Sequence, residues 1–359
     1  MSQNQNLEIL NALDELEKSK GISKEILLEA LDTALVSAYK RHYGSSQNVS
    51  VSIDLQSGKI QVISRYLVVE DPQDPKAEVS LAEAKEKNVS LELGDYLEIE
   101  VTPKEFGRIA AQTAKQVVVQ RIREAERGVI FEEFANCEGD IVGGQVHRFD
   151  QKSILVDLGK VEGMIPYQEQ IPGELLNQGQ RIKCYVVEVR KTNKGTMVML
   201  SRTHPGLLKR LLELEVPEIA TGVVEIKSIA REAGSRSKVA VSTKDENVDP
   251  IGACVGPKGI RIQAIVNELS GEKIDVIPYS DDPAKFVTNA ISPAVAIGVK
   301  ADVISKVAQV TVPDNQLSLA IGREGQNARL SAKVTGWKID IKSESQVTSD
   351  VVSEFEIDF

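Results

Sequence analysis

The chain has 359 residues, of which 42% are hydrophobic and 4% aromatic, and its formal net charge is −10. Its length predicts several domains, and no run approaches the roughly 18 apolar residues of a membrane span. The acidic excess lies before residue 138 and after residue 347, so the nearly neutral middle can bind a nucleic acid by local contacts but not by bulk charge.

Residues 1–135 are predicted to form an α/β N-terminal domain that ends in a long helix. A continuous helical pattern from Pro103 to about Phe134, with Gly107 and Gly128 as its weak points, predicts a helix roughly 45 Å long. The other expected elements are helices at 7–16 and 23–43 and strands at 49–54, 59–69 and 96–101.

Residues 136–202 read as a small Greek-key β-barrel with strands at 141–149, 153–158, 163–166, 181–189 and 197–200. The run 156–166 resembles the S1 type of OB-fold, in which exposed aromatic residues stack on bases. His147, Phe149 and Tyr167 are the candidates. Two other readings stay open, namely Phe149 as a core residue and His147 as an ordinary surface residue. The family's phenylalanine pair is replaced by polar residues at 150–153, which predicts weak RNA binding by the barrel alone.

Two Gly-x-x-Gly motifs, at 256–259 and 322–325, carry most of the functional signal. About two such matches are expected by chance, so their surroundings decide. Each motif follows an apolar segment, precedes a helical one, and then leads through a glycine, Gly271 or Gly336, into a strand. The tetrapeptide Ser-Lys-Val-Ala also recurs, at 237–240 and 305–308. We interpret the region as an internal duplication with a period near 66 residues.

The glycines suit a loop that meets a phosphodiester closely, and the following helix directs its positive N-terminal end at the phosphates. Pro257 stiffens the first loop, whereas Glu324 repels phosphate, so the second loop should bind more weakly. The alternative is a pair of ordinary helical corners with glycine caps. The predicted RNA contacts are Gly256, Pro257, Lys258, Gly259 and Arg261 in the first unit and Gly322, Arg323, Glu324, Gly325 and Arg329 in the second.

These units resemble the KH domain of the bacterial type, type II. The expected domains are 203–279 and 280–345, with short linkers at 204–216 and 277–285 and an acidic tail at 346–359. The tail is read as a partner hook, as a mask for the RNA surface, or as a disordered end without a role. The fold class is therefore α+β multidomain, with an S1-type barrel followed by two tandem KH domains.

Together with the run 105–127 on the long helix, the whole order resembles the NusA family of bacterial transcription elongation and termination factors. The resemblance implies core RNA polymerase and nascent single-stranded RNA as partners, with other antitermination factors possible, and a role in pausing, termination and antitermination. It places polymerase contacts at Arg108, Lys115 and Arg121, and simple solvated charge is the alternative for Lys115 and Arg121. The chain stops without the acidic C-terminal repeats of longer family members.

No enzyme pattern stands out in the sequence. The three histidines have no cysteine or histidine at metal-ligand spacing, and no phosphate-loop or nucleophile-elbow motif occurs. Three scattered cysteines favour a reduced, cytoplasmic protein without a disulfide framework. A phosphorolytic exoribonuclease would carry the same RNA modules after a catalytic core for which there is no room, and a ribosome-associated protein would lack the long-helix motif. We expect a monomer that is not an enzyme and needs no cofactor.

Overall fold

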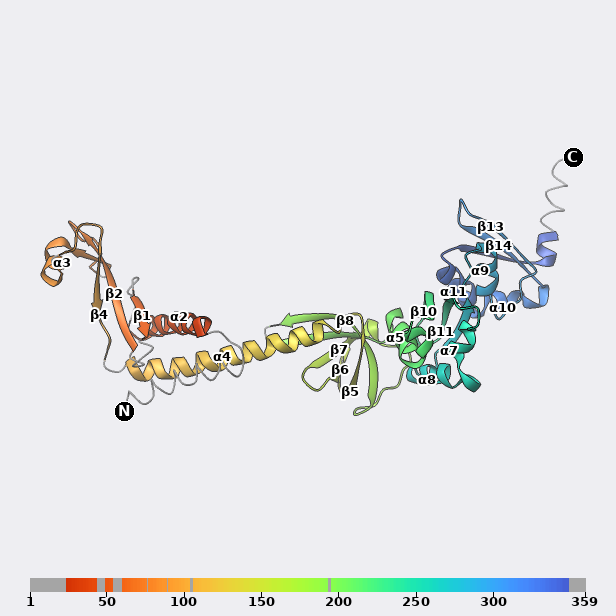
Figure 1. Ribbon diagram of the computed structural model, residues 1–359, viewed down its shortest axis with the longest axis horizontal. Helices are drawn as coiled ribbons and strands as arrows, with labels where there is room; N and C mark the ends of the chain where they lie inside the picture. The colour runs from red at the N-terminus through yellow and green to blue at the C-terminus, as the bar shows by residue number, and fades with distance from the viewer. Residues whose placement is uncertain are drawn as a thin grey trace. The chain divides into compact units, whose positions relative to one another are not determined.

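The computed structural model describes residues 24–43, 49–53, 60–75, 77–88, 90–103, 106–192 and 195–348 (Figure 1). The chain divides into two compact units, Met1–Val129 and Ile130–Phe359. The helix expected at 7–16, the start of the next one at Ser23, and the tail beyond residue 348 fall outside the described ranges. No helix in the described part is long and apolar enough to cross a membrane.

In the described part of the first unit, a mixed sheet packs with α2 (Lys24–Tyr43) and with the first turns of α4 (Phe106–Ala135). Leu31 and Leu35 on α2 and Phe106 and Ala110 on α4 repeat at a spacing of four residues, so each helix turns one apolar stripe into the same core. Strand β2 (Ile60–Val69) pairs with all three of the other described strands in the sheet, which are β1 (Val49–Ile53), β3 (Glu78–Ser80) and β4 (Tyr96–Glu100).

Two elements of the first unit were missed by the sequence reading, namely β3 and the helix α3 (Leu81–Lys87) that follows it. Both are too short to show a period, although Ser80 is an N-cap whose side chain accepts a hydrogen bond from the Glu83 amide. The long helix is continuous through Gly107 and Gly128, as predicted.

In the second unit the last turns of α4 lead into a closed five-stranded barrel. Phe134 at the end of the helix joins the barrel core. The strand order is β5-β6-β7-β9-β8, the Greek-key order of an OB-fold, which confirms the predicted barrel. The strands are β5 (Ile141–Asp150), β6 (Ser153–Asp157), β7 (Glu162–Pro166), β8 (Arg181–Thr192) and β9 (Gly195–Ser201).

Two modules of like topology follow the barrel, each with an antiparallel strand pair and a third strand that joins the middle one in parallel. This is the strand order expected of the two KH units. The first contains α5 (Pro205–Glu215), α6 (Pro217–Ala220), β10 (Val224–Glu232), β11 (Arg236–Thr243), α7 (Pro250–Val255), α8 (Ile260–Glu268) and β12 (Lys273–Pro278). The second contains α9 (Pro283–Ala290), β13 (Gly298–Asp302), β14 (Val307–Val312), α10 (Leu317–Ile321), α11 (Gln326–Thr335) and β15 (Lys338–Ser343).

The structure corrects two details of the duplication. The stretch 204–216 is not a linker, because α5 fills it and buries Leu207, Leu208 and Leu211 in the core of the first module. The recurring tetrapeptide is not equivalent in the two modules either. Its first copy lies within β11, whereas Ser305 and Lys306 lie in the turn before β14. Strand pairing instead makes Arg236 the counterpart of Val307, since each faces the lysine two positions after its module's glycine.

The two KH modules share a core. Ala230, Ala240 and Ile277 on the sheet of the first module pack against α9 and α11 of the second, where Phe286 and Leu330 are buried. The fully buried Lys238 of β11 donates to the Ser292 carbonyl of the second module at 2.6 Å, and burial lowers the pKa of this lysine. The modules are therefore joined by packing and not by a flexible tether.

Two buried thiols should make the free energy of unfolding depend on pH. Burial raises the pKa of Cys184 to about 12 and that of Cys254 to about 11, whereas a cysteine in the unfolded chain has a pKa of about 8.5. The unfolded chain loses these protons first, so the free energy of unfolding should fall by about 2 kcal/mol per thiol between pH 8 and pH 10. Urea titrations of wild type and Cys184→Ala check this, because the variant should lose its share of the fall. The same fall in both proteins would contradict it.

Candidate nucleic-acid interface

The two Gly-x-x-Gly loops have the same backbone conformation. Gly256 and Gly322, the first residues, have φ 74° and ψ 172° in one case and φ 77° and ψ 171° in the other. The last residues, Gly259 and Gly325, are both left-handed, with φ 76° and 74°. The duplication seen in the sequence is therefore a duplication of loop geometry as well.

The first glycine of each loop is needed for space as well as for conformation. A Cβ on Gly322 would lie 2.8 Å from the backbone nitrogen of Asn327, and one on Gly256 would lie 2.7 Å from the Arg261 side chain. Positive φ at both positions strains any other residue. The loop can thus fold back tightly onto the helix that follows it.

The third loop residues, Lys258 and Glu324, are held in the left-handed region with φ 54° and 52°, and both are exposed. Non-glycine residues in this region cost energy and cluster at functional sites. Lys258 presents a cation here, whereas Glu324 lies 3.7 Å from Arg323 in a solvent-exposed ion pair. The second loop is therefore close to neutral, in line with the weaker binding expected of it.

Helices α8 and α11 begin directly after the loops, and within the described residues no side chain caps either N-terminus. Their first amides and positive dipole ends thus face the loop surface without a protein acceptor from a capping side chain. Ile260 at the start of α8 is 66% exposed, an apolar neighbour of the loop that the sequence reading missed. Phosphate at the helix end and a base against such a side chain are the contacts that this arrangement favours.

Both predicted RNA-binding arginines behind the loops have partners within the protein. Arg261 Nη1 donates to Glu218 Oε2 at 2.9 Å and to the Ala253 carbonyl at 2.7 Å. Arg329 donates to both carboxylate oxygens of Glu232, at 2.7 and 3.2 Å. Neither pairing was visible from the sequence, because the partners lie 43 and 97 positions away.

The barrel candidates lie at its surface. Phe149 near the end of β5 is 52% exposed, which removes the reading that it is a core residue, and Tyr167 after β7 is 73% exposed. His147 Nδ1 lies 2.7 Å from Glu162 Oε1 on the neighbouring part of the sheet. The barrel therefore offers one free aromatic face on β5 and a second beside β7, with the histidine held by a carboxylate.

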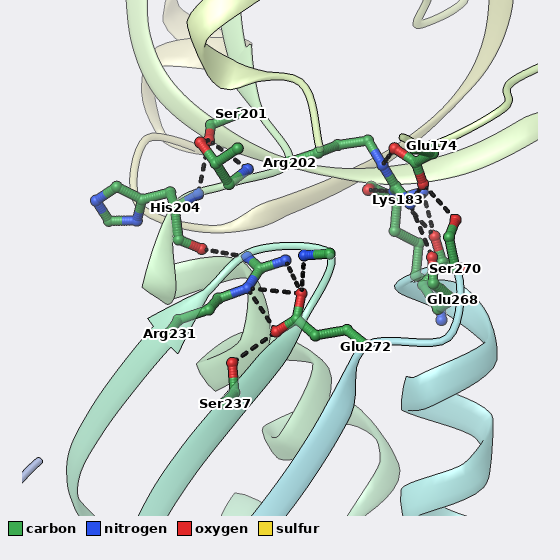
Figure 2. A network of polar contacts seen from close by, with 12 residues as sticks. Glu174, Lys183, Ser201, Arg202, His204, Arg231, Ser237, Glu268, Ser270 and Glu272 are labelled. Carbon is green, nitrogen blue, oxygen red and sulfur yellow. Dashed lines mark hydrogen bonds and ion pairs between the residues drawn. The ribbon is translucent and has the colours of Figure 1, made fainter. Parts of the chain in front are cut away.

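A buried guanidinium joins the barrel to the first KH module (Figure 2). Arg202 and Glu174 are 2% and 3% exposed, and two nitrogens of the arginine contact the two carboxylate oxygens at 2.5 and 2.8 Å. The same guanidinium donates to the Lys183 carbonyl of the barrel at 2.7 Å and to the Glu268 carbonyl at the end of α8 at 2.8 Å. Glu174 also accepts from Ser270 of the KH module at 2.6 Å. The charge is fully satisfied across the junction.

A second buried pair lies beside the first. Arg231 and Glu272 have no exposed side-chain surface and contact each other at 2.9 Å. Arg231 also donates to the His204 carbonyl at 2.8 Å, and the His204 ring stacks on Tyr185 of the barrel at 4.3 Å. The chain segment that leaves the barrel is thus held from both sides, which fixes the barrel against the first loop's module.

The predicted polymerase contacts lie on α4. Arg108 and Lys115 are exposed, and Arg121 forms an ion pair with Glu124 at 2.9 Å. Among the described residues no group of three or more His, Cys, Asp or Glu side chains is placed to hold a metal ion.

Comparison with protein families matches four domain models along the chain. They are the NusA N-terminal domain at residues 8–128, the S1 RNA binding domain at 137–199, the NusA-like first KH domain at 202–279 and the NusA-like second KH domain at 283–349.

Curated relatives match over nearly the full chain. A transcription termination/antitermination protein NusA of Halalkalibacterium halodurans is 58% identical over 95% of this chain and 89% of its own length. The protein of the same name from Bacillus subtilis is 58% identical over 94% and 91%, and that of Thermus thermophilus is 44% identical over 96% and 92%.

Proposed function

The chain belongs to the NusA family of transcription termination/antitermination proteins, and from that premise we propose that it associates with core RNA polymerase and holds nascent RNA. It has the S1 and KH domains, which are RNA-binding modules, in the family's order. Pausing, termination and antitermination would then be modulated by how long the emerging RNA strand stays bound to these modules.

The observation that carries the RNA part of the proposal is the matched pair of loops, each ending at a helix N-terminus without a capping side chain. Single strands suit such a site, since each KH loop clamps about four nucleotides whose bases are splayed out. We assign phosphate contacts to the first loop, Gly256 to Gly259, and weaker ones to the second, Gly322 to Gly325. Phe149 on the barrel would add stacking, and His147 would contact RNA only by leaving Glu162.

We further propose that the barrel and the two KH modules present one RNA track. The buried pairs at the first junction and the shared core at the second support this, because they leave the three RNA modules little freedom to move apart. The division into domains 1–135, 136–202, 203–279, 280–345 and an acidic tail 346–359 belongs to the same proposal.

The N-terminal domain is proposed to provide the polymerase contact, through Arg108, Lys115 and Arg121 on α4. We propose a cytoplasmic monomer that uses no cofactor, catalyses no reaction and accepts other antitermination factors as partners. The curated relatives are named as transcription termination/antitermination proteins and not as enzymes, which supports the proposed absence of an enzymatic role.

Charge reversal on α4 tests the polymerase contact in the full chain. Arg108→Glu combined with Lys115→Glu should weaken co-migration with bacterial core RNA polymerase at least about tenfold, because two attractive contacts become repulsive. A matched variant, Lys152→Glu with Lys285→Glu, reverses the same number of exposed charges in the second unit and should co-migrate normally. Equal losses in both variants would place the contact elsewhere, and no co-migration of wild type would leave only the RNA part of the proposal.

A further inference from the structure

One carboxylate of the first KH module holds the second module at the start of its loop-proximal helix. Glu232, near the end of β10, accepts from Arg329 Nε at 2.7 Å and Nη2 at 3.2 Å, and from Gln326 Nε2 at 2.9 Å. Gln326 also donates to Ser235 of the first module at 2.7 Å. The Glu232 side chain is 22% exposed, and the hydrogen bond from Arg329 keeps the pKa of its carboxyl below the usual value.

Arg329 extends this contact to the second loop itself. Its remaining terminal nitrogen, Nη1, donates to the backbone carbonyl of Glu324 at 2.8 Å. That carbonyl belongs to the residue held in the left-handed conformation at the third loop position. A single guanidinium therefore ties the second Gly-x-x-Gly loop to a strand of the first KH module.

The helix that carries Arg329 cannot move independently of the first module. Leu330, the next residue, and Val334, one turn further, are buried in the core that the modules share. Ser228 of β10 also donates to the Val334 carbonyl at 2.7 Å. The arginine thus extends from a fixed helix, and its contacts fix the loop ahead of that helix.

The first loop is anchored differently. Its supporting arginine, Arg261, bonds to Ala253 and Glu218, both within the first module's own part of the chain. The second loop alone depends, among the described residues, on a side chain of the other module for this support. The duplicated loops therefore differ in what holds them.

We propose that Glu232 and Arg329 are positioning residues that set the second KH loop against the first module, so that one RNA strand meets both loops in a fixed register. In this proposal Arg329 acts through the loop backbone, because each of its three guanidinium nitrogens donates to Glu232 or to the Glu324 carbonyl. A phosphate contact through its remaining N–H groups is the alternative that the salt dependence tests. The proposal rests on the proposed RNA-binding function and deepens it by assigning the spacing of the two loops.

RNA length separates positioning from phosphate contact. Glu232→Gln and Arg329→Gln should each weaken binding of an unstructured RNA of about twelve nucleotides by about tenfold. Binding of an RNA of about five nucleotides, which one loop can hold, should change less than about twofold. The double variant should be no weaker than either single variant, since both remove the same contact. Glu225→Gln on the same strand is the matched control, because its partners Lys227 and Lys244 lie in the first module.

The salt dependence of RNA affinity shows whether Arg329 instead contacts phosphate. A phosphate ligand contributes about 0.7 to the slope of log affinity against log salt on a single strand. A slope that falls by this amount in Arg329→Gln but not in Glu232→Gln would overturn the positioning role. Unchanged slopes with parallel losses for the long RNA support it.

Hydrogen exchange of the free protein tests the same contact without RNA. In Glu232→Gln the amides of residues 323–326 should exchange several-fold faster than in wild type, while those of residues 258 and 259 keep their rates. Unaltered exchange at 323–326 would overturn the proposal. Failure of wild type to bind either RNA would instead refute the proposed function, and the exchange result would still decide whether Glu232 positions the loop.

Discussion

Replacing Arg202 with methionine should lower the free energy of unfolding of the second unit by about 3–5 kcal/mol, the usual cost of leaving one partner of a buried ion pair behind. Glu174 would lose its guanidinium partner in a site that is 3% exposed, and of the contacts given above it would retain only the Ser270 hydroxyl. The carbonyls of Lys183 and Glu268 would also lose their donor. Chemical denaturation followed by circular dichroism measures the change.

A second substitution decides whether charge burial is the cause. Arg202→Met combined with Glu174→Met should recover most of the lost stability, because a buried apolar pair leaves no unpaired charge. Arg190→Met, which removes an exposed arginine from its pair with Glu188, should have no measurable effect. A double variant as unstable as Arg202→Met would show that the hydrogen bonds to the two carbonyls carry the effect instead.

Acidic substitution of the first loop should weaken RNA binding about a hundredfold, and the same change in the second loop only about fivefold. Pro257→Asp with Lys258→Asp removes one cation and adds two anions at an exposed tip. Arg323→Asp with Glu324→Asp changes a single charge site, because Glu324 is already acidic. Fluorescence anisotropy with an unstructured RNA compares the two variants under one salt concentration.

The backbone conformation at Lys258 allows a control substitution that keeps the loop intact. Lys258 has φ 54°, a conformation that asparagine and aspartate tolerate better than most residues, so the loop should keep its shape. Lys258→Asn, which removes the cation without adding an anion, should fall between wild type and the acidic variant. Equal losses from both loops would refute the ranking, and a lowered melting temperature in the first-loop variant would attribute its loss to folding.

Local patterns predicted most of the architecture. The five barrel strands and the long helix were expected within a few residues of their observed ends, because their apolar residues recur at regular strand or helix spacing. The strand β3, of three residues, has no such period and was missed. The equivalence of the tetrapeptides was wrong because a short sequence match does not fix strand register, whereas the pairing of Arg236 with Lys273 does.

The site was predictable where it is made of contiguous residues and not where it is made of tertiary pairs. The Gly-x-x-Gly loops could be read directly, since glycine at set spacing reports on backbone geometry. Arg261 and Arg329 were read as RNA contacts from their charge, but their carboxylate partners come from other elements. The burial of Arg202 was hidden for the same reason, since its partners Glu174 and Glu268 lie 28 and 66 positions away.

The two KH modules share a topology, but the residues on the outer faces of their sheets determine which module can stand first and which second. In the first module this face carries Ala230, Ala240 and Ile277, which the second module covers. Strand pairing places Lys300, Thr311 and Lys342 at the corresponding positions of the second module.

The outer sheet face of the first module is therefore apolar and buried, as in an internal repeat. The same face of the second module is polar, as in a terminal repeat. Exchanging the two copies would expose the apolar face and bury lysines, so the duplicated halves have become non-interchangeable. A further copy added at this end of the stack would find no surface to dock on until those polar positions had been replaced.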